Sequence, residues 1–137
     1  MADSNLLIVN PITVKLIPGK NRGVIANCSM LAGETIEIAP TVAVSHIDHN
    51  IVIGTKLFDY LFIKPQDYKI KDSNSYLVFG LSSLCNHSQN PNTYIKWVDD
   101  EICSWAHLIA LQNIEPGEEI TLYYTNIDEY GNAPTFI

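Results

Sequence analysis

The stretch Gly80-Leu81-Ser82-Ser83-Leu84-Cys85-Asn86-His87-Ser88-Gln89-Asn90-Pro91-Asn92 joins an apolar run to a polar segment rich in turn-forming residues. Residues 77–84 are largely apolar, as in a buried stretch, and the chain then becomes polar. Asn and Ser side chains can bond their own backbone and Pro fixes φ, so residues 89–92 predict a turn. The Asn86-His87 pair at this boundary supports two interpretations, a binding site or an Asx-turn beside a satisfied core histidine.

A second patterned stretch, Ala110-Leu111-Gln112-Asn113-Ile114-Glu115-Pro116-Gly117-Glu118-Glu119-Ile120-Thr121-Leu122-Tyr123-Tyr124, lies towards the end of the chain. Residues 119–124 predict a strand, and Gly117 marks the turn before it. A glycine turn followed by acidic residues is common on protein surfaces, so this stretch alone identifies no site.

The N-terminal half predicts short strands separated by turns. Residues 6–17 have a strand-like composition interrupted by Pro11 and followed by Pro18, and residues 18–23 predict a turn. A short strand is expected over residues 24–26, a turn over 32–34, and a strand-like run over 35–44.

Two more strands are expected over residues 93–98 and 102–111, joined as a hairpin by the acidic tip 99–101. The apolar pattern of residues 56–63 does not separate a strand from a buried helix. We find no amphipathic helix of ordinary length, no internal repeat and no low-complexity tract. These patterns predict a β-dominated domain of many short strands.

The length and composition indicate one soluble globular domain over residues 1–137. The 137 residues are 47% apolar and 17% charged, enough apolar surface for a packed core. No apolar stretch is long enough for a membrane span, and the acidic start does not resemble the cationic region of a signal peptide. We therefore expect an intracellular soluble protein, cytoplasmic or, for a host-targeting effector, nuclear or secreted.

The formal net charge of −7 repels phosphate backbones, which disfavours a nucleic-acid partner and favours a basic protein or peptide. Simple solubility is the alternative explanation for the charge. Cys28, Cys85 and Cys103 lack the C-x-x-C spacing of a structural zinc site, so we expect buried thiols and no metal.

Three segments, taken together and in this order, resemble the SET-domain family of protein lysine methyltransferases. Residues 22–26 with 33–36 are similar to its N-terminal glycine turn and following strand, residues 86–92 to its N-H-S-x-x-P-N signature, and residues 117–124 to its G-E-E-[IL]-T-x-x-Y segment. The resemblance spans about residues 14–124 and is closest to minimal viral and bacterial-type members. Asn21 stands where the family usually has glycine, and asparagine is the residue that best tolerates the positive φ expected there.

The resemblance implies a mainly β fold of several small sheets with a knot-like C-terminal crossing. It implies S-adenosylmethionine as cofactor and methyl transfer to a lysine of a basic protein, with histones and ribosomal proteins as candidate substrates. Small relatives often pair, so a homodimer is compatible with it. The residues that match the cofactor-binding positions are Lys20, Asn21, Arg22, Tyr60, Asn86, His87 and Tyr124.

The resemblance assigns catalysis to Tyr124 and to Tyr60, which alone could equally be a core tyrosine. Methyl transfer to an amine is an in-line displacement, so positioning is most of the task, and an apolar channel would lower the pKa of the incoming lysine.

Strand alternation predicts that Tyr123 points to the opposite face from Tyr124 and serves in packing. The tail aromatics Tyr130 and Phe136 match residues that close over the adenine or the lysine channel, or belong to a frayed end.

Two alternatives remain open. His46-Ile47-Asp48, with His87 or His107, has the H-x-D pattern of a non-haem iron site, although no Lys or Arg follows Lys96 to bind an oxo-acid cosubstrate; an ordinary polar loop between strands also explains this segment. The other alternative is a catalytically silent SET-like module that binds a peptide or the cofactor, against which the retained Tyr124 argues.

Overall fold

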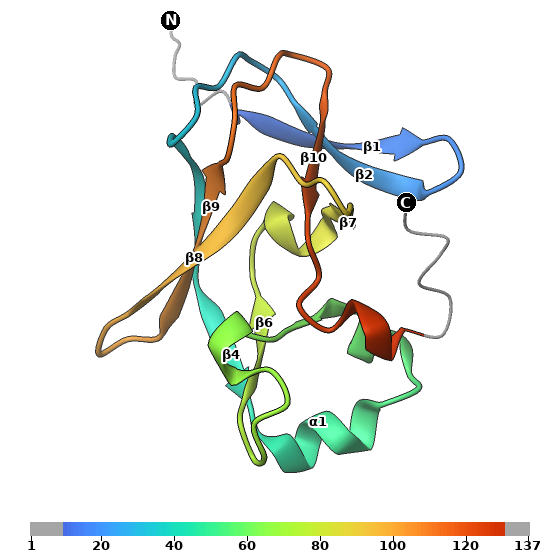
Figure 1. The fold of residues 1–137 in the computed structure, drawn as a ribbon, viewed down its shortest axis with the longest axis vertical. Coiled ribbons are helices and arrows are strands. Elements are labelled where there is room, and N and C mark those ends of the chain that lie inside the picture. Colours follow the sequence, from blue (N-terminus) through green and yellow to red (C-terminus); the bar gives the residue numbers. More distant parts are fainter. Residues whose placement is uncertain (1–9, 131–137) are drawn as a thin grey trace, which may run out of the picture.

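The computed structural model describes residues 10–130, which form three small sheets connected by short helical turns (Figure 1). The mainly β class predicted from the sequence is confirmed. The N-terminal hairpin lies at one end of the molecule and helix α1 (His46–Val52) at the other (Figure 1). No helix in the described part is both long and apolar enough to cross a membrane.

The first sheet joins strands from the N-terminal and the C-terminal parts of the chain. Its order is β1 (Ile12–Ile17), β2 (Asn21–Ala26), β10 (Glu119–Leu122) and β7 (Asn86–His87). β10 pairs antiparallel with β2 and parallel with β7. The amide of Asn92 extends this pairing, because its Nδ2 donates to the carbonyl of Glu119 and its Oδ1 accepts from the amide of Thr121. The C-terminal strand thus crosses the segment 86–92, as the predicted crossing requires.

The second sheet has the order β3 (Thr35–Ala39), β9 (Ser104–Ala110) and β8 (Thr93–Asp99), and β8 and β9 form the predicted hairpin. The third has the order β4 (Thr41–Val44), β6 (Ser75–Val78) and β5 (Leu61–Phe62). The strand-like run 35–44 is therefore two strands in two sheets. They meet at Pro40, which has no backbone N–H to continue a ladder.

Segments 45–68 and 81–84 contain helical turns that the sequence patterns did not define. Helix α1 replaces the expected polar loop; Ser45 caps it by accepting a hydrogen bond from the Asp48 amide, and none of its residues is buried. The ambiguous segment 56–63 is a 3₁₀ turn, η1 (Lys56–Tyr60), followed by β5. The other 3₁₀ turns are η2 (Pro65–Asp67), η3 (Leu81–Leu84) and η4 (Ile127–Glu129).

The main core lies between the first sheet and β9, with η3 packed against it. Its buried residues are Ile12, Val24, Ala26, Met30, Cys85, Leu108, Ala110, Ile114, Ile120 and Leu122. The expectation of three buried thiols was wrong for two of them: Cys85 is buried, Cys28 is exposed and Cys103 is half-buried. Cys28 follows the end of β2 in a surface turn, where no core contact is available.

Candidate functional site

The turn between β1 and β2 presents side chains rather than free backbone donors. Asn21 has the predicted positive φ, 69°. The backbone N–H of Lys20 donates to the carbonyl of Ile17 and that of Arg22 to the carbonyl of Lys20, so both amides are used within the turn. The charged groups that this turn presents to an approaching anion are the Lys20 ammonium and the Arg22 guanidinium.

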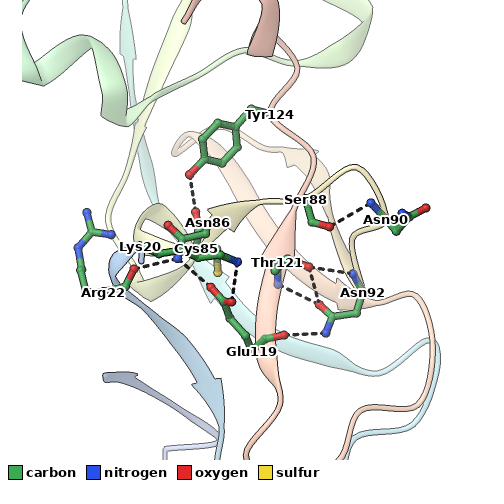
Figure 2. A network of polar contacts seen from close by, with 10 residues as sticks. All are labelled: Lys20, Arg22, Cys85, Asn86, Ser88, Asn90, Asn92, Glu119, Thr121 and Tyr124. Carbon is green, nitrogen blue, oxygen red and sulfur yellow. Dashed lines mark hydrogen bonds and ion pairs between the residues drawn. The ribbon is translucent and has the colours of Figure 1, made fainter. Parts of the chain in front are cut away.

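Asn86 and Glu119 connect this turn to the crossing segments (Figure 2). Asn86, which is 6% exposed, donates from Nδ2 to the carbonyl of Arg22 at 2.8 Å and to Oε2 of Glu119 at 2.7 Å. The other carboxylate oxygen of Glu119 pairs with Lys20 Nζ at 3.0 Å. This group, Lys20, Arg22, Asn86 and Glu119, is called the polar hub below.

Glu119 is a member of the hub that sequence reasoning missed as a site residue. It was visible in the G-E-E pattern, but its role depends on β10 lying beside both β2 and β7. Gly23 is required in the same place, since a Cβ there would lie 2.7 Å from Glu119 Oε2 and 2.8 Å from Asn86 Nδ2. Contacts that short do not occur between a real Cβ and its neighbours. Any side chain at position 23 would therefore displace Glu119 or Asn86, and the hub requires glycine there.

Arg22 extends from the hub to Tyr60. Its Nη2 donates to the Tyr60 hydroxyl at 2.6 Å and its Nη1 to the carbonyl of Leu84 at 3.3 Å. The guanidinium carbon also lies 5.7 Å from the centre of the Tyr60 ring. The structure thus brings Tyr60 to the predicted cofactor-binding residues, and a catalytic role for Tyr60 stays a prediction.

His87 is enclosed by two tyrosines. Its ring is 1% exposed and lies 4.8 Å from the Tyr123 ring and 5.2 Å from the Tyr124 ring, centre to centre. Its Nδ1 accepts a hydrogen bond from the backbone N–H of Tyr124 at 2.9 Å, while its buried Nε2 has no partner among the described residues. Burial lowers the pKa of His87 below its usual value of 6.5, so the ring is neutral near pH 7.

Tyr124 points its hydroxyl back at the signature segment (Figure 2). The hydroxyl donates to the carbonyl of Cys85 at 2.6 Å, one residue before Asn86. Burial raises the pKa of Tyr124 well above its usual value of 10, with the neighbouring Tyr130 adding to the effect. Tyr124 therefore stays a neutral phenol that can donate and accept hydrogen bonds but does not act as a phenolate base.

The ring of Tyr124 lines a cavity of about 470 Å³. Its other walls are mostly apolar and aromatic and include Phe62, Ile95, Trp97, Leu122 and Tyr130. Tyr123 lines the same cavity, so its predicted placement on the opposite face was wrong. β10 ends at Leu122, and the alternation of a strand does not extend to the next two residues.

Lys64 packs against Trp97, which forms part of the wall of this cavity. It is only 5% exposed, and its ammonium lies 3.1 Å from Asp99 Oδ1 and 3.0 Å from Ser104 Oγ. The same ammonium lies 4.9 Å from the ring centre of Tyr76 and 5.6 Å from that of Trp97. This contact ties the loop after β5 to the β8–β9 hairpin, and no sequence pattern pointed to it.

The C-terminal end of the described chain closes the cavity. Tyr130 donates from its hydroxyl to the carbonyl of Asp59 at 3.2 Å and its ring lies 5.6 Å from that of Tyr124. Asp128, in η4, accepts hydrogen bonds from the Tyr68 hydroxyl and from Lys69 Nζ. Tyr130 thus lies beside Tyr124 at the cavity, and its closure over the adenine or the lysine channel stays a prediction; Phe136 falls outside the described residues.

The rival iron site is not assembled. His46 and Asp48 lie in α1, where His46 Nε2 is 3.4 Å from Asp72 Oδ1, and His87 is buried beside Tyr124. Among residues 10–130, no three His, Cys, Asp or Glu side chains are grouped so as to hold a metal ion.

Comparisons with known proteins agree on one family. The SET domain family model matches residues 21–125. Over 118 residues the chain is 26% identical to a histone-lysine N-methyltransferase, H3 lysine-37 specific, from Schizosaccharomyces pombe, covering 86% of this chain and 76% of the relative. Over 52 residues it is 48% identical to an H3 lysine-36 specific histone-lysine N-methyltransferase from Debaryomyces hansenii, covering 37% of this chain but only 7% of that much longer protein.

A solved structure shares the fold. The crystal structure of a proposed histone methyltransferase from Plasmodium falciparum superposes with a TM-score of 0.66 at 26% identity, covering 85% of this chain and 95% of that one.

Proposed function

Since this chain belongs to the SET domain family, we propose that it is a protein-lysine N-methyltransferase that uses S-adenosylmethionine. The observation that carries the proposal is the position of Tyr124. Its ring lines the apolar cavity, and its hydroxyl bonds the carbonyl of Cys85 beside the polar hub. One side chain therefore adjoins a surface suited to an alkyl amine and a surface suited to an amino acid.

The hub residues fit the amino-acid end of S-adenosylmethionine, which supplies an electrophilic methyl group when bound. A zwitterion needs cations for its carboxylate and acceptors for its ammonium. Lys20 and Arg22 provide the cations. Asn86 uses its Nδ2 within the protein, and its Oδ1 receives no hydrogen bond from residues 10–130, which makes it an acceptor for the ammonium.

The cavity fits the substrate lysine. Apolar walls disfavour the ammonium form and so lower the lysine pKa from about 10.4 towards neutrality, which exposes the lone pair that the displacement needs. The neutral hydroxyl of Tyr124 can then orient the amine by hydrogen bonding. Holding the nitrogen in line with the transferred methyl accounts for most of the catalysis in such a displacement.

We further propose histone H3 tails as the first substrates to test. The support is the specificity of the relatives for H3 lysine-36 and H3 lysine-37, together with the acidic net charge of −7. A basic tail is attracted to an acidic protein by long-range electrostatics.

The test is transfer of radiolabelled methyl from S-adenosylmethionine to histone H3, nucleosomes and ribosomal proteins. H3 peptides spanning the lysine-36 and lysine-37 region, each paired with a lysine-to-arginine version, locate the acceptor, and mass spectrometry counts the methyl groups added. Label that appears in the lysine peptides and not in their arginine counterparts supports the proposal. Calorimetric binding of the cofactor with no transfer to any acceptor would instead support a silent binding module.

A further inference from the structure

The backbone of Tyr124 is bonded at both of its polar groups: its carbonyl accepts a hydrogen bond from the Ile127 N–H at 3.1 Å, and its N–H donates to the side chain of His87. Tyr124 lies two residues beyond the end of β10, so the ladder no longer fixes it. The hydrogen bond from its N–H to His87 Nδ1, at 2.9 Å, helps to fix the Tyr124 backbone, and the imidazole packs against the Tyr124 ring at 5.2 Å. Parallel pairing of Leu122 with His87 in turn places the imidazole at this point.

This hydrogen bond is compatible with one protonation state of the ring. Nδ1 must carry a lone pair to accept from the Tyr124 N–H, so the single proton of the neutral ring sits on Nε2. A second proton on Nδ1 would set two donors facing each other and would leave a charge inside a site that is 1% exposed.

We propose, resting on the methyltransferase function above, that His87 is a positioning residue that sets the place of Tyr124 only as the neutral, Nε2-protonated imidazole. The geometry of Tyr124 relative to the cavity then depends on His87. A misplacement of the catalytic hydroxyl by about 1 Å is enough to slow an oriented reaction on the order of 100-fold.

Few titratable groups face the ring. Among residues 10–130, those in ring contact with it are the phenols of Tyr123 and Tyr124. The charged side chains of the neighbouring elements have other partners: Glu119 of β10 pairs with Lys20, and Arg22 of β2 donates to the Tyr60 hydroxyl. Burial is the cause of the lowered pKa of His87, so protonation and loss of the hydrogen bond occur only as the pH falls below 6.5.

Two substitutions separate positioning from packing. His87→Asn keeps an acceptor close to the Nδ1 position and cannot be protonated, whereas His87→Leu fills part of the space and removes the acceptor. We expect His87→Leu to lower kcat roughly 10- to 100-fold with KM for the peptide nearly unchanged. We expect His87→Asn to recover most of the kcat at neutral pH and to abolish the acidic limb of the kcat profile. His107→Asn on β9, outside the hub and the cavity walls, is the matched control.

Nuclear magnetic resonance of the protein without ligand supplies a readout that does not need activity. The imidazole ¹⁵N shifts of His87 should show an unprotonated Nδ1 and a protonated Nε2 near pH 7. The Tyr124 amide should move in His87→Leu and stay close to its wild-type position in His87→Asn. Thermal unfolding and the overall ¹H–¹⁵N spectrum show whether each variant is folded.

The outcomes distinguish the two proposals. A wild-type protein that methylates nothing refutes the function, while the ¹⁵N and amide shifts still decide whether His87 holds Tyr124. A protonated Nδ1, an unmoved Tyr124 amide in His87→Leu, or equal loss of kcat in the leucine and asparagine variants would overturn the positioning role.

Discussion

The side-chain amide of Asn86 has a structural role in the fold, and we propose that it also binds the cofactor. Its two N–H groups hold the β1–β2 turn and Glu119 together, and its carbonyl oxygen remains an acceptor. The resemblance to the N-H-S-x-x-P-N signature was enough to single out this residue. It was not enough to predict the hub, because the partner Glu119 reaches Asn86 only through the pairing of β10 with β7.

Asn86→Ala should weaken the affinity for S-adenosylmethionine at least tenfold, measured by calorimetry. The change removes the acceptor and leaves the buried carbonyl of Arg22 and a carboxylate oxygen of Glu119 without their donor, at a cost of about 1–3 kcal/mol. Asn90→Ala, the same change at an exposed position nearby, is the control and should bind normally. Wild-type affinity in Asn86→Ala would argue against the hub as the cofactor site.

If the Tyr124 hydroxyl orients the amine as proposed, Tyr124→Phe should lower kcat and kcat/KM together by roughly 100-fold, because the lost interaction strengthens in the transition state. The ring and its packing remain and only the hydrogen bond to the Cys85 carbonyl is lost, at a cost of about 0.5–1.5 kcal/mol, so the variant should stay folded with a melting temperature only a few degrees lower. Tyr76→Phe removes a hydroxyl from a buried tyrosine outside the cavity walls and serves as the control. Turnover at the wild-type rate in Tyr124→Phe would move the assignment to Tyr60.

At the scale of elements, the strands were predictable and the short helices were not. The hairpin of β8 and β9 and the last strand β10 follow from β-branched and aromatic alternation. Helix α1 has no buried residue, with Ile47 and Ile51 exposed, so it carries no amphipathic pattern to detect. The segment 56–63 contains a 3₁₀ turn followed by a two-residue strand, and neither element is long enough to produce a recognisable periodicity of apolar residues in the sequence.

The β1–β2 hairpin depends on Gly23 for its approach to β10. Gly23→Ala should destabilise the protein by about 1–3 kcal/mol, because the new methyl group overlaps Glu119 Oε2, Asn86 Nδ2 and Ile17 Cγ1. Urea unfolding measures the change, and cofactor calorimetry should show weaker binding as the hub is displaced.

Gly33→Ala is the control for Gly23→Ala, because it introduces backbone strain without steric overlap. Gly33 has φ of 91° and open space around the position of a Cβ, so its substitution costs conformational strain alone, about 1–2 kcal/mol. It lies away from the hub and should leave cofactor binding intact. Equal loss of cofactor affinity in both variants would contradict the crowding argument.

At the scale of the whole molecule, the excess of acidic residues should govern encounter with a basic substrate. The KM for an H3 peptide should rise with ionic strength while kcat changes little, because the screening length shortens from about 30 Å at about 0.01 M salt to about 8 Å at about 0.15 M. A peptide with the same lysine and neutral flanking residues should show a much smaller effect. A KM for the basic peptide that is independent of salt would exclude this steering.

The position of β10 between β2 and β7 has a consequence for how the protein folds. Lys20 and Glu119 are 99 residues apart in sequence, so the hub closes a loop that includes most of the chain. Closing long loops before their contacts form is entropically costly and slows folding. The polar hub is therefore completed only when β10 has been synthesised and has paired with β2 and β7, and amide exchange in β10 should require opening of the first sheet as a unit.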